Sequence, residues 1–364
     1  MPPRFGVSFL PRSADRVSGW ARLAEELGFA RVGIGDSPAL YRDPWMTLAL
    51  VARATERIPI GIWVTNPATR HPVVTASAAA MLDELAPGRV CIGIATGDSG
   101  VSGAGLRPGG VDGLAAYVRA VRALLENGEA SYEGATARLS WPERSRQVPI
   151  YVAAHGQRSM QLAGEIADGA IMGLGILPAI IDQSLEWLRQ GAVRAGRRHD
   201  DIDVWWTVRY LVDERADVAR TEMAGILAEA AHMLARTAFK AMPGGSEHQA
   251  GLERLASEYD PVMYGRSEPD VRRRHARRAA ELGVADYLLD RYAFAGTPEE
   301  CASQVERATR AGATQFMYSM RGPDRESRLR DWHRLVMTRA SGESQADPPV
   351  GERSSGARGV SGSG

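Results

Sequence analysis

The sequence is poor in lysine and cysteine. Lys240 is the only lysine, so almost all of the positive charge is carried by arginine. Schiff-base and lysine-base chemistry are therefore largely excluded. Cys91 lies in an apolar stretch and Cys301 in a helical pattern, and two such cysteines do not form a disulfide framework. We expect a protein of the reducing cytoplasm.

Long apolar runs and an excess of one charge are missing too. No apolar stretch is long enough for a transmembrane helix, and the first residues lack the apolar core of a signal peptide. The 44 basic residues balance 44 acidic ones. Neither a nucleic acid nor an anionic membrane is therefore expected as a partner, which leaves a small-molecule substrate.

Motifs of several common catalytic classes are absent as well. Gly33 and Gly35 begin a dinucleotide fingerprint, but Pro38 stands where its third glycine would be. The sequence contains no lysine-bearing phosphate loop and no Gly-x-Ser-x-Gly nucleophile elbow. The seven histidines show no metal-ligand spacing, so no metal site is expected.

What the sequence does contain is a regular alternation of short apolar stretches with amphipathic ones. Eight strands separated by helices, combined with right-handed crossovers, predict an α/β fold that closes as a (β/α)8 TIM barrel. A doubly wound open sheet is the competing arrangement. The predicted strands are 5–10, 31–35, 58–64, 90–95, 148–154, 169–172, 202–212 and 313–320.

Two segments interrupt the alternation. Residues 131–141 have the pattern of a short hairpin, and residues 214–282 are mostly helical, which predicts a helical insertion after strand seven. Residues 1–340 would then form one barrel domain. Residues 341–364 are rich in Ser, Gly and Pro, so we expect a disordered tail there.

Polar, glycine-rich loops follow four of the predicted strands, at residues 33–38, 63–72, 95–100 and 153–159. Each loop by itself can be explained by tight turns at glycine and by helix caps at Asp or Ser. Function in such barrels collects at the carboxyl ends of the strands. Four polar loops on one rim therefore predict a binding site there.

Several segments resemble a known family. They include Asn66-Pro67 with Arg70-His71-Pro72, Thr96-Gly97-Asp98 and Thr297-Pro298-Glu299-Glu300. Over residues 4–338 and in the same order, the chain resembles the luciferase-like flavin and deazaflavin oxidoreductases. It is most similar to their coenzyme F420-dependent branch, which includes methylenetetrahydromethanopterin reductase. The matching segments are 24–29, 60–67, 70–72, 82–90, 93–98, 149–154, 163–169 and 295–300.

The resemblance implies an F420-dependent oxidoreductase. It would transfer a hydride between the deazaflavin C5 and an organic substrate, with reduction of a C=C or C=N bond as the expected direction. An FMN-dependent monooxygenase is the alternative, and a flavin-binding barrel without enzymatic activity is the second alternative. The resemblance also implies a homodimer.

Roles for individual residues follow from the resemblance. Asp36 would contact the deazaflavin ring, while Ser37 stands where a residue often serves in proton transfer, although a serine is a poor acid. A non-prolyl cis peptide at Trp63-Val64 would back the ring. Three consecutive residues, Thr96, Gly97 and Asp98, would contact the ring and its side chain.

Asp98 is the expected proton donor. A carboxyl group beside a bound ring and shielded from water acquires a raised pKa, which suits a general acid near neutral pH. The alternative is that Asp98 only caps the following segment.

A phosphate group is expected at the start of the helix that follows strand five. Backbone N–H groups at a helix N-terminus bind anions, and a basic and a hydroxyl side chain are present there. The residues concerned are Ala154, His155, Gly156, Gln157, Arg158 and Ser159.

The insertion is expected to form the wall of the substrate pocket. Its aromatic and apolar residues would favour a substrate that is apolar or aromatic in part, although most of them could equally belong to the core. The candidate wall residues are Trp205, Trp206, Tyr210, Met233, Phe239 and Tyr264.

Overall fold

A computed structural model describes residues 2–142, 147–236, 246–259, 268–320 and 324–341. Eight parallel strands close into a barrel, in which β8 pairs with β9 and β11 pairs with β1. The predicted TIM barrel is confirmed. Its strands are β1 (Arg4–Phe9), β2 (Arg31–Ile34), β3 (Ile60–Thr65), β4 (Val90–Ile94), β7 (Ile150–Ala154), β8 (Gly169–Met172), β9 (Asp203–Val212) and β11 (Gln315–Ser319).

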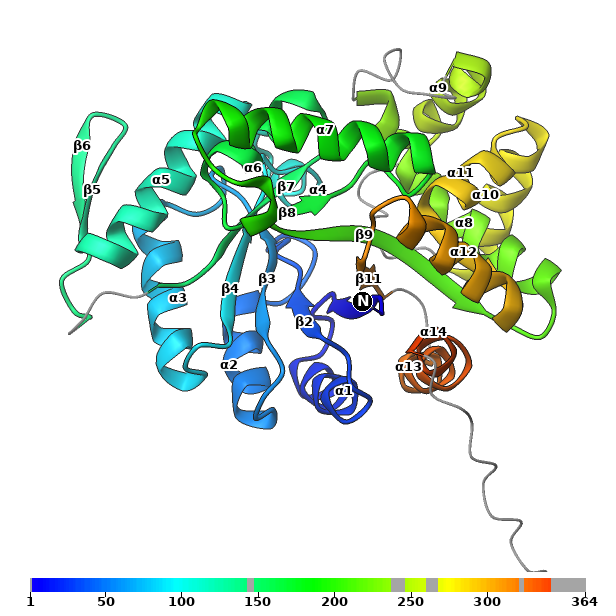
Figure 1. Ribbon diagram of the computed structural model, residues 1–364, viewed down its shortest axis with the longest axis horizontal. Helices are drawn as coiled ribbons and strands as arrows, with labels where there is room; N and C mark the ends of the chain where they lie inside the picture. The colour runs from blue at the N-terminus through cyan, green and yellow to red at the C-terminus, as the bar shows by residue number, and fades with distance from the viewer. Residues whose placement is uncertain (1, 143–146, 237–245, 260–267, 321–323, 342–364) are drawn as a thin grey trace, which may run out of the picture.

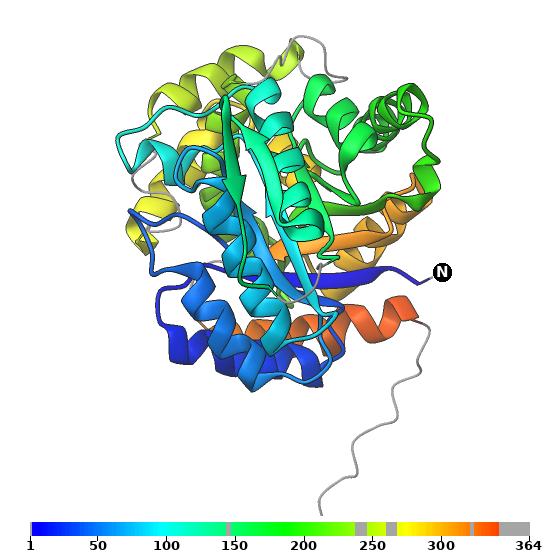
Figure 2. The same ribbon diagram turned by 90° about the vertical axis from the view of Figure 1, so that its left-hand side faces the viewer.

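Helices surround the strands (Figures 1 and 2). Local sequence explains where several of them begin. Asp43 caps α2 by accepting hydrogen bonds from two backbone N–H groups, and Thr297 forms a capping box with Glu300 at α12. The surrounding helices are α1 (Ala14–Glu26), α2 (Pro44–Ala54), α3 (Pro72–Leu85), α5 (Val111–Asn127), α6 (Gln157–Ile166), α7 (Pro178–Arg194), α12 (Pro298–Arg310), α13 (Arg325–Trp332) and α14 (Thr338–Ser341).

The interior of the barrel is packed with side chains. Residues alternate inward and outward along each strand, and the inward set combines glycines with large aromatic residues. A Cβ atom on Gly33 would lie 2.6 Å from the Cβ of Trp63, and one on Gly169 would lie 2.1 Å from the Cε1 of Tyr151. These glycines therefore make room for the aromatic rings. The rings fill the barrel, so its interior is a packed core and not a channel.

A buried polar cluster occupies the end of the barrel where the strands begin. The Tyr151 hydroxyl and the Trp205 Nε1 donate to Oδ2 of Asp203, at 2.7 and 2.8 Å. Arg31 donates to the Tyr151 hydroxyl at 2.8 Å, and the Gln315 amide donates to the other oxygen of Asp203. Burial alone would raise the pKa of Asp203, but these hydrogen bonds and the charge of Arg31 hold it below its usual value. We call these five residues the barrel-floor cluster.

The helical insertion follows β9, as predicted, and lies at the opposite end of the molecule from the β5–β6 hairpin (Figure 1). Its helices share an apolar core of their own. They continue to Tyr292, beyond the predicted end at residue 282. The insertion consists of α8 (Ala216–Arg236), the short 3-10 helix Ser246–His248, α9 (Gln249–Ser257), α10 (Pro269–Glu281) and α11 (Ala285–Tyr292).

One strand was not predicted. β10 (Ala293–Gly296) pairs with the final residues of β9, from Arg209 to Val212, and so attaches the insertion to the barrel. The predicted hairpin is present as the antiparallel pair β5 (Glu129–Tyr132) and β6 (Ala135–Arg138).

The prediction that Trp205, Trp206 and Tyr210 line the pocket wall is wrong. Trp205 is fully buried in the barrel-floor cluster. Trp206 and Tyr210 belong to the outer core between strands and helices, where Tyr210 stacks on Trp332 with ring centroids 3.9 Å apart. An apolar pattern alone does not distinguish these two environments.

Other predictions concern parts of the chain that are only partly described. Met233 is partly buried on α8, whereas Phe239, Tyr264 and residues 342–364 of the predicted tail lie outside the described residues. In the described ranges, no helix combines the length and the apolar character needed to cross a bilayer.

Candidate active site

The four polar loops come together because their strands are neighbours. β2, β3, β4 and β7 follow one another in the sheet, so their carboxyl ends form a continuous arc of the barrel rim. The structure therefore places the predicted site residues side by side. Within the described ranges, no group of three His, Cys, Asp or Glu residues is arranged to hold a metal ion.

Asp36, in the loop after β2, is tied into a buried ion-pair network. Its side chain is completely buried and receives Nε of Arg70 at 2.8 Å and the Thr65 hydroxyl at 2.7 Å. Arg70 also bonds Asp43 at 2.8 Å. Burial alone would lower the pKa of Arg70, but both carboxylates raise it above its usual range. This network joins the loops after β2 and β3.

Arg70 is a functional candidate that the sequence did not single out. In the sequence, Arg70 is only one residue of a family segment, because the residues around it do not reveal that its partner is Asp36, more than thirty positions earlier. The signal that could have predicted the pair is that the acid and the basic residue follow two adjacent strands.

The non-prolyl cis peptide expected at Trp63-Val64 is present. The pairing of β3 with β4 shifts register between Ile62 and Thr65, so the irregularity spans this bond. The Trp63 ring points into the barrel, where its centroid lies 5.7 Å from that of Tyr151. The ring thus forms part of the packed interior beneath the rim.

Asp98 stands at the start of α4 (Ser99–Ser102), a short helix that was not predicted. Its backbone carbonyl accepts from the N–H groups of Val101 and Ser102, but its carboxylate caps none of the described N–H groups of α4. The alternative that this side chain only caps the following segment is therefore wrong. Asp98 is partly buried.

The turn before Asp98 requires glycine. Gly97 has φ +95°, and a Cβ atom there would lie 2.3 Å from Cγ2 of Val101. α4 then packs against the loop after β2, because a Cβ on Gly100 would lie 3.1 Å from the Ser37 hydroxyl oxygen. Ser37 is buried beneath this contact.

His155 directly follows β7, the next strand of the barrel, and its ring lies against Gly173 of the loop after β8. A Cβ atom on Gly173 would lie 2.2 Å from Nε2 of the imidazole. Burial lowers the pKa of His155, and the nearby Asp98 carboxylate partly opposes this shift. The imidazole is therefore neutral near pH 7, and Asp98 is close enough for its charge to act on it.

The start of α6 has the features expected of an anion site. A Cβ atom on Gly156 would meet nothing within 4 Å, so the backbone there faces open space. Arg158 is exposed and pairs with Asp112 at 2.9 Å. The Ser159 hydroxyl accepts from the His155 N–H and donates to the Gly156 carbonyl, so it shapes the loop.

An arginine-bearing groove of about 290 Å³ continues from this point between α5 and α6. Because the Arg158–Asp112 pair is exposed on both sides, little free energy opposes its exchange for a bound anion. The charged residues that line the groove are Asp112, Arg119, Arg158, Glu165 and Arg194.

Two arginines join the insertion to the rim, and the sequence did not reveal either role. Arg291 is fully buried, donates from Nε to the Leu174 carbonyl at 2.7 Å and lies over the Tyr292 ring. Arg209, near the end of β9, pairs with Glu229 of α8 at 2.8 Å. Both contacts link distant parts of the chain, which local patterns do not predict.

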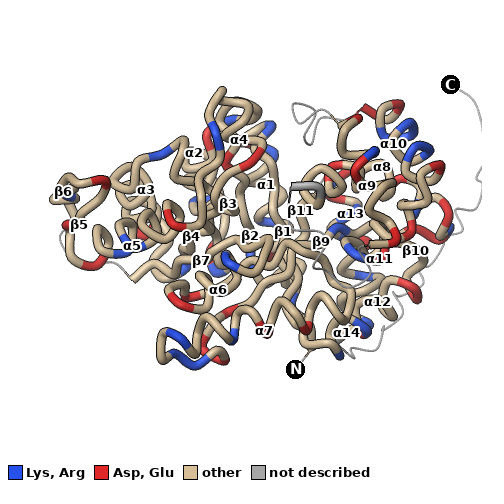
Figure 3. Tube along the Cα trace, turned by 90° about the horizontal axis from the view of Figure 1, so that it is seen from above, with Lys and Arg blue, Asp and Glu red and all other residues tan. Residues whose placement is uncertain are grey.

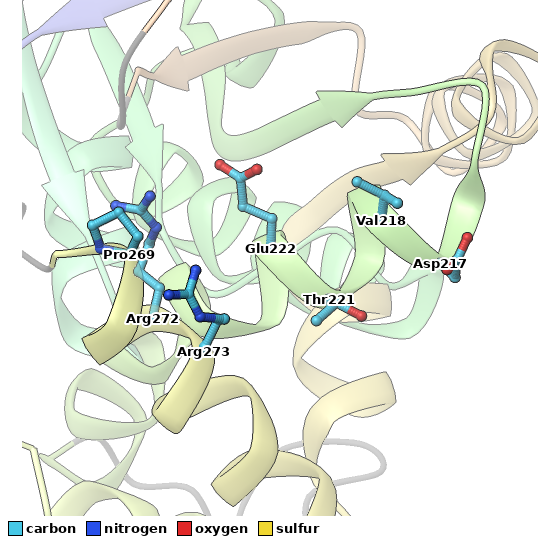
Figure 4. A pocket seen from close by; sticks show the side chains of 7 residues that line it. All are labelled: Asp217, Val218, Thr221, Glu222, Pro269, Arg272 and Arg273. Carbon is cyan, nitrogen blue, oxygen red and sulfur yellow. The ribbon is translucent and has the colours of Figure 1, made fainter.

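The surface of the insertion also holds a groove, of about 350 Å³, between α8 and α10 (Figure 4). Its lining has both signs of charge, from Asp217 and Glu222 on α8 to Arg272 and Arg273 on α10. Along α10, basic residues face acidic neighbours, as in the pair Arg278–Glu258 at 2.9 Å (Figure 3). The predicted rim residues do not line this groove.

Comparison with known proteins gives a consistent result. Residues 3–315 match the model of a family described as luciferase-like monooxygenase. The 5,10-methylenetetrahydromethanopterin reductase of Methanolobus tindarius is 26% identical over 339 residues, which cover 90% of this chain and 97% of that protein.

Solved structures share the fold. The coenzyme F420-dependent tetrahydromethanopterin reductase from Methanopyrus kandleri superposes with a TM-score of 0.69 at 23% identity, covering 93% of this chain and 99% of that one. An F420-dependent secondary alcohol dehydrogenase, in complex with an F420-acetone adduct, gives a TM-score of 0.70 at 20% identity, with coverage of 92% and 98%.

Proposed function

The chain belongs to the luciferase-like monooxygenase family, and from this premise we propose that it is an F420-dependent oxidoreductase. It transfers a hydride between the deazaflavin C5 and a small organic substrate, in the direction that reduces a C=C or C=N bond. The name of a relative supports the cofactor, because a protein of Microbacterium testaceum that is 27% identical over 365 residues is named F420-dependent glucose-6-phosphate dehydrogenase.

The residues of the rim fit this cofactor. The open backbone at Gly156 and the exposed Arg158 suit its phosphate, because α6 has 10 residues and the N-terminus of such a helix attracts an anion. Gly97, whose turn has no room for a side chain, would present its backbone to the ring. When bound there, the deazaflavin supplies the two-electron step.

The observation that carries the proposal is the position of Asp98 on the rim. It follows β4, is partly buried, and lies close enough to His155 for its charge to act on the imidazole, whereas the Asp36 carboxylate is bonded to Arg70. We assign to Asp98 the transfer of a proton to the atom beside the reduced carbon. The rim as a whole orients the substrate and excludes water.

FMN is the alternative cofactor, and a monooxygenase is the corresponding activity. The family description favours this alternative, whereas the relatives named F420-dependent glucose-6-phosphate dehydrogenase favour F420. The second alternative is a flavin-binding barrel without enzymatic activity. Turnover of any substrate by the purified protein would exclude it.

Cofactor titration under anaerobic conditions tests the proposal. Oxidised F420 is added to the purified protein and binding is followed by the fluorescence of the deazaflavin. We expect saturable F420 binding and no change in binding when FMN is added in excess. Tight FMN binding that displaces F420, followed by oxygen consumption when air is admitted to the reduced complex, would establish the monooxygenase instead.

The substrate is proposed to be small and partly polar. Trp205 belongs to the barrel floor, so it does not contribute to the aromatic pocket wall that the sequence predicted. On the insertion side of the rim, Arg209 and Glu229 form a buried ion pair. Such a pair favours a substrate that carries a polar group next to an apolar portion.

We also propose that the protein is a homodimer. α2 exposes Met46 and Leu50 on one face, and the adjacent α3 exposes Val74 and Met81. Large apolar side chains exposed together on neighbouring helices are typical of an interface. We call these four residues the α2–α3 patch.

A further inference from the structure

The loops that carry Asp98 and His155 leave adjacent strands of the barrel. β4 and β7 are paired in parallel, with Ile94 opposite Val152, so the segments that follow emerge side by side. Asp98 and His155 stand a few residues beyond this pair of positions. Both residues therefore lie on the same short stretch of the rim, where the charge of Asp98 acts on the imidazole.

One contact of the ring and two hydrogen bonds of the loop determine where His155 lies. Its ring fills the space that Gly173 leaves open, since a Cβ there would lie 2.2 Å from Nε2. Its backbone N–H donates to the Ser159 hydroxyl at 3.2 Å, and that hydroxyl donates to the Gly156 carbonyl. The ring position is thus determined by β8 and α6 as well as by β7.

Among the described residues, one carboxylate acts on the imidazole. Arg158 of α6 pairs with Asp112 of α5, and Gly173 of the β8 loop carries no side chain. Asp98 of the β4 loop is the carboxylate whose charge acts on the ring. In the β2 loop, which packs against α4, Asp36 is bonded to Arg70, and the Ser37 hydroxyl does not titrate near neutral pH.

We propose that His155 is the positioning residue of Asp98. The neutral imidazole holds the carboxyl group toward the mouth of the barrel and returns to it, from water, the proton that Asp98 gives up in each reduction. The substrate gains a hydride and a proton, Asp98 loses that proton, and the imidazole relays one proton back, so the pair ends each cycle unchanged.

The existence of the pair is tested on the protein without cofactor. Histidine carbon and nitrogen signals are followed by NMR during a pH titration of the native chain and of Asp98→Asn. We expect His155 to titrate below the usual range for histidine, and lower still in Asp98→Asn, because the variant removes the negative charge that stabilises the imidazolium. Asp112→Asn is the matched control and should leave the His155 titration unchanged.

The geometry is tested by moving the ring without changing its chemistry. Gly173→Ala forces the imidazole away from β8, whereas Gly113→Ala adds the same methyl group where nothing lies within 4 Å. We expect Gly173→Ala, and not Gly113→Ala, to abolish the coupling between Asp98 and His155 in the NMR titration. If the His155 titration is the same in Asp98→Asn and in Gly173→Ala as in the native chain, Asp98 and His155 do not form a pair.

The catalytic role rests on the proposed function and is tested separately. His155→Gln keeps a hydrogen-bonding group but cannot relay a proton, so we expect repeated turnover of substrate to slow about tenfold relative to the first turnover and its pH profile to flatten. An unchanged pH profile contradicts the relay. If the native chain does not bind F420 at all, the proposed function fails, while the NMR result still decides whether the pair exists.

Discussion

Asp36 and Asp98 are two rim carboxylates to which the surrounding residues give different tasks. Arg70 and Thr65 occupy the oxygens of Asp36, whose side chain is completely buried, so this group holds two loops together. Asp98 is partly buried, and its carboxylate caps none of the described N–H groups of α4. The resemblance implies that both residues belong to the cofactor site, and the geometry supports the proposal that Asp98, and not Asp36, transfers the proton.

Removing the Arg70 charge should destabilise the protein strongly. In Arg70→Met, the buried Asp36 carboxylate loses its cation, and breaking a buried pair in this way costs about 3–5 kcal/mol. Arg158→Met is the matched control, because its pair with Asp112 is exposed and worth under about 1 kcal/mol. Urea denaturation measures both free energies of unfolding, and equal losses in the two variants would refute the assignment.

At the scale of elements, the regular alternation of apolar and amphipathic segments was sufficient to predict the eight barrel strands and the rim loops. It did not predict β10, because four residues after a helix are too few to show a period. It also did not show that Trp205 faces the barrel interior while Trp206 faces the helices. Both side chains are apolar, and the sequence alone does not fix the face.

Contacts between distant elements were the other part that the sequence did not reveal. Arg291 bonds the Leu174 carbonyl across the barrel rim, and Arg70 reaches Asp36 from the neighbouring loop. Side-chain patterns report local periodicity, whereas these pairs depend on which strands become neighbours after the chain folds. The predicted phosphate site depended less on long-range contacts, because a helix N-terminus is a local feature.

The barrel-floor cluster predicts how stability depends on pH. Hydrogen bonds and the Arg31 charge keep the pKa of Asp203 lowered in the folded state, so the folded protein releases this proton more readily than the unfolded chain. Its stabilising contribution is complete above the unfolded pKa and disappears as the pH falls through the folded one. We expect Asp203→Asn to be less stable than the native chain at neutral pH and the difference to shrink in acid.

Denaturant titrations of the native chain and of Asp203→Asn over the acid range measure this dependence. Asp112→Asn serves as the control, since its side chain is almost fully exposed. A difference between the native chain and Asp203→Asn that stays constant down to strongly acid pH would show that the Asp203 charge does not stabilise the barrel floor.

At the scale of the whole molecule, the insertion lies at one end (Figure 1). The helices α2 and α3, which expose the four residues of the α2–α3 patch, lie away from that end. Leu50→Glu with Met81→Glu should yield monomers, because two buried charges without partners would oppose association.

Light scattering coupled to gel filtration measures the molar mass of these variants. Val193→Glu is the control, since Val193 is an equally exposed apolar residue on α7, outside the patch. A native chain that is already monomeric, or a double variant that remains dimeric, would exclude the α2–α3 patch as the interface.

Native mass spectrometry of the full chain with F420 and FMN present at equal concentration tests the central claim most directly. The account predicts one F420 bound per chain and no bound FMN, because the helix N-terminus at Gly156 and the rim loops form a site for the deazaflavin and its phosphate. A spectrum that shows FMN in place of F420, or neither cofactor, would contradict it.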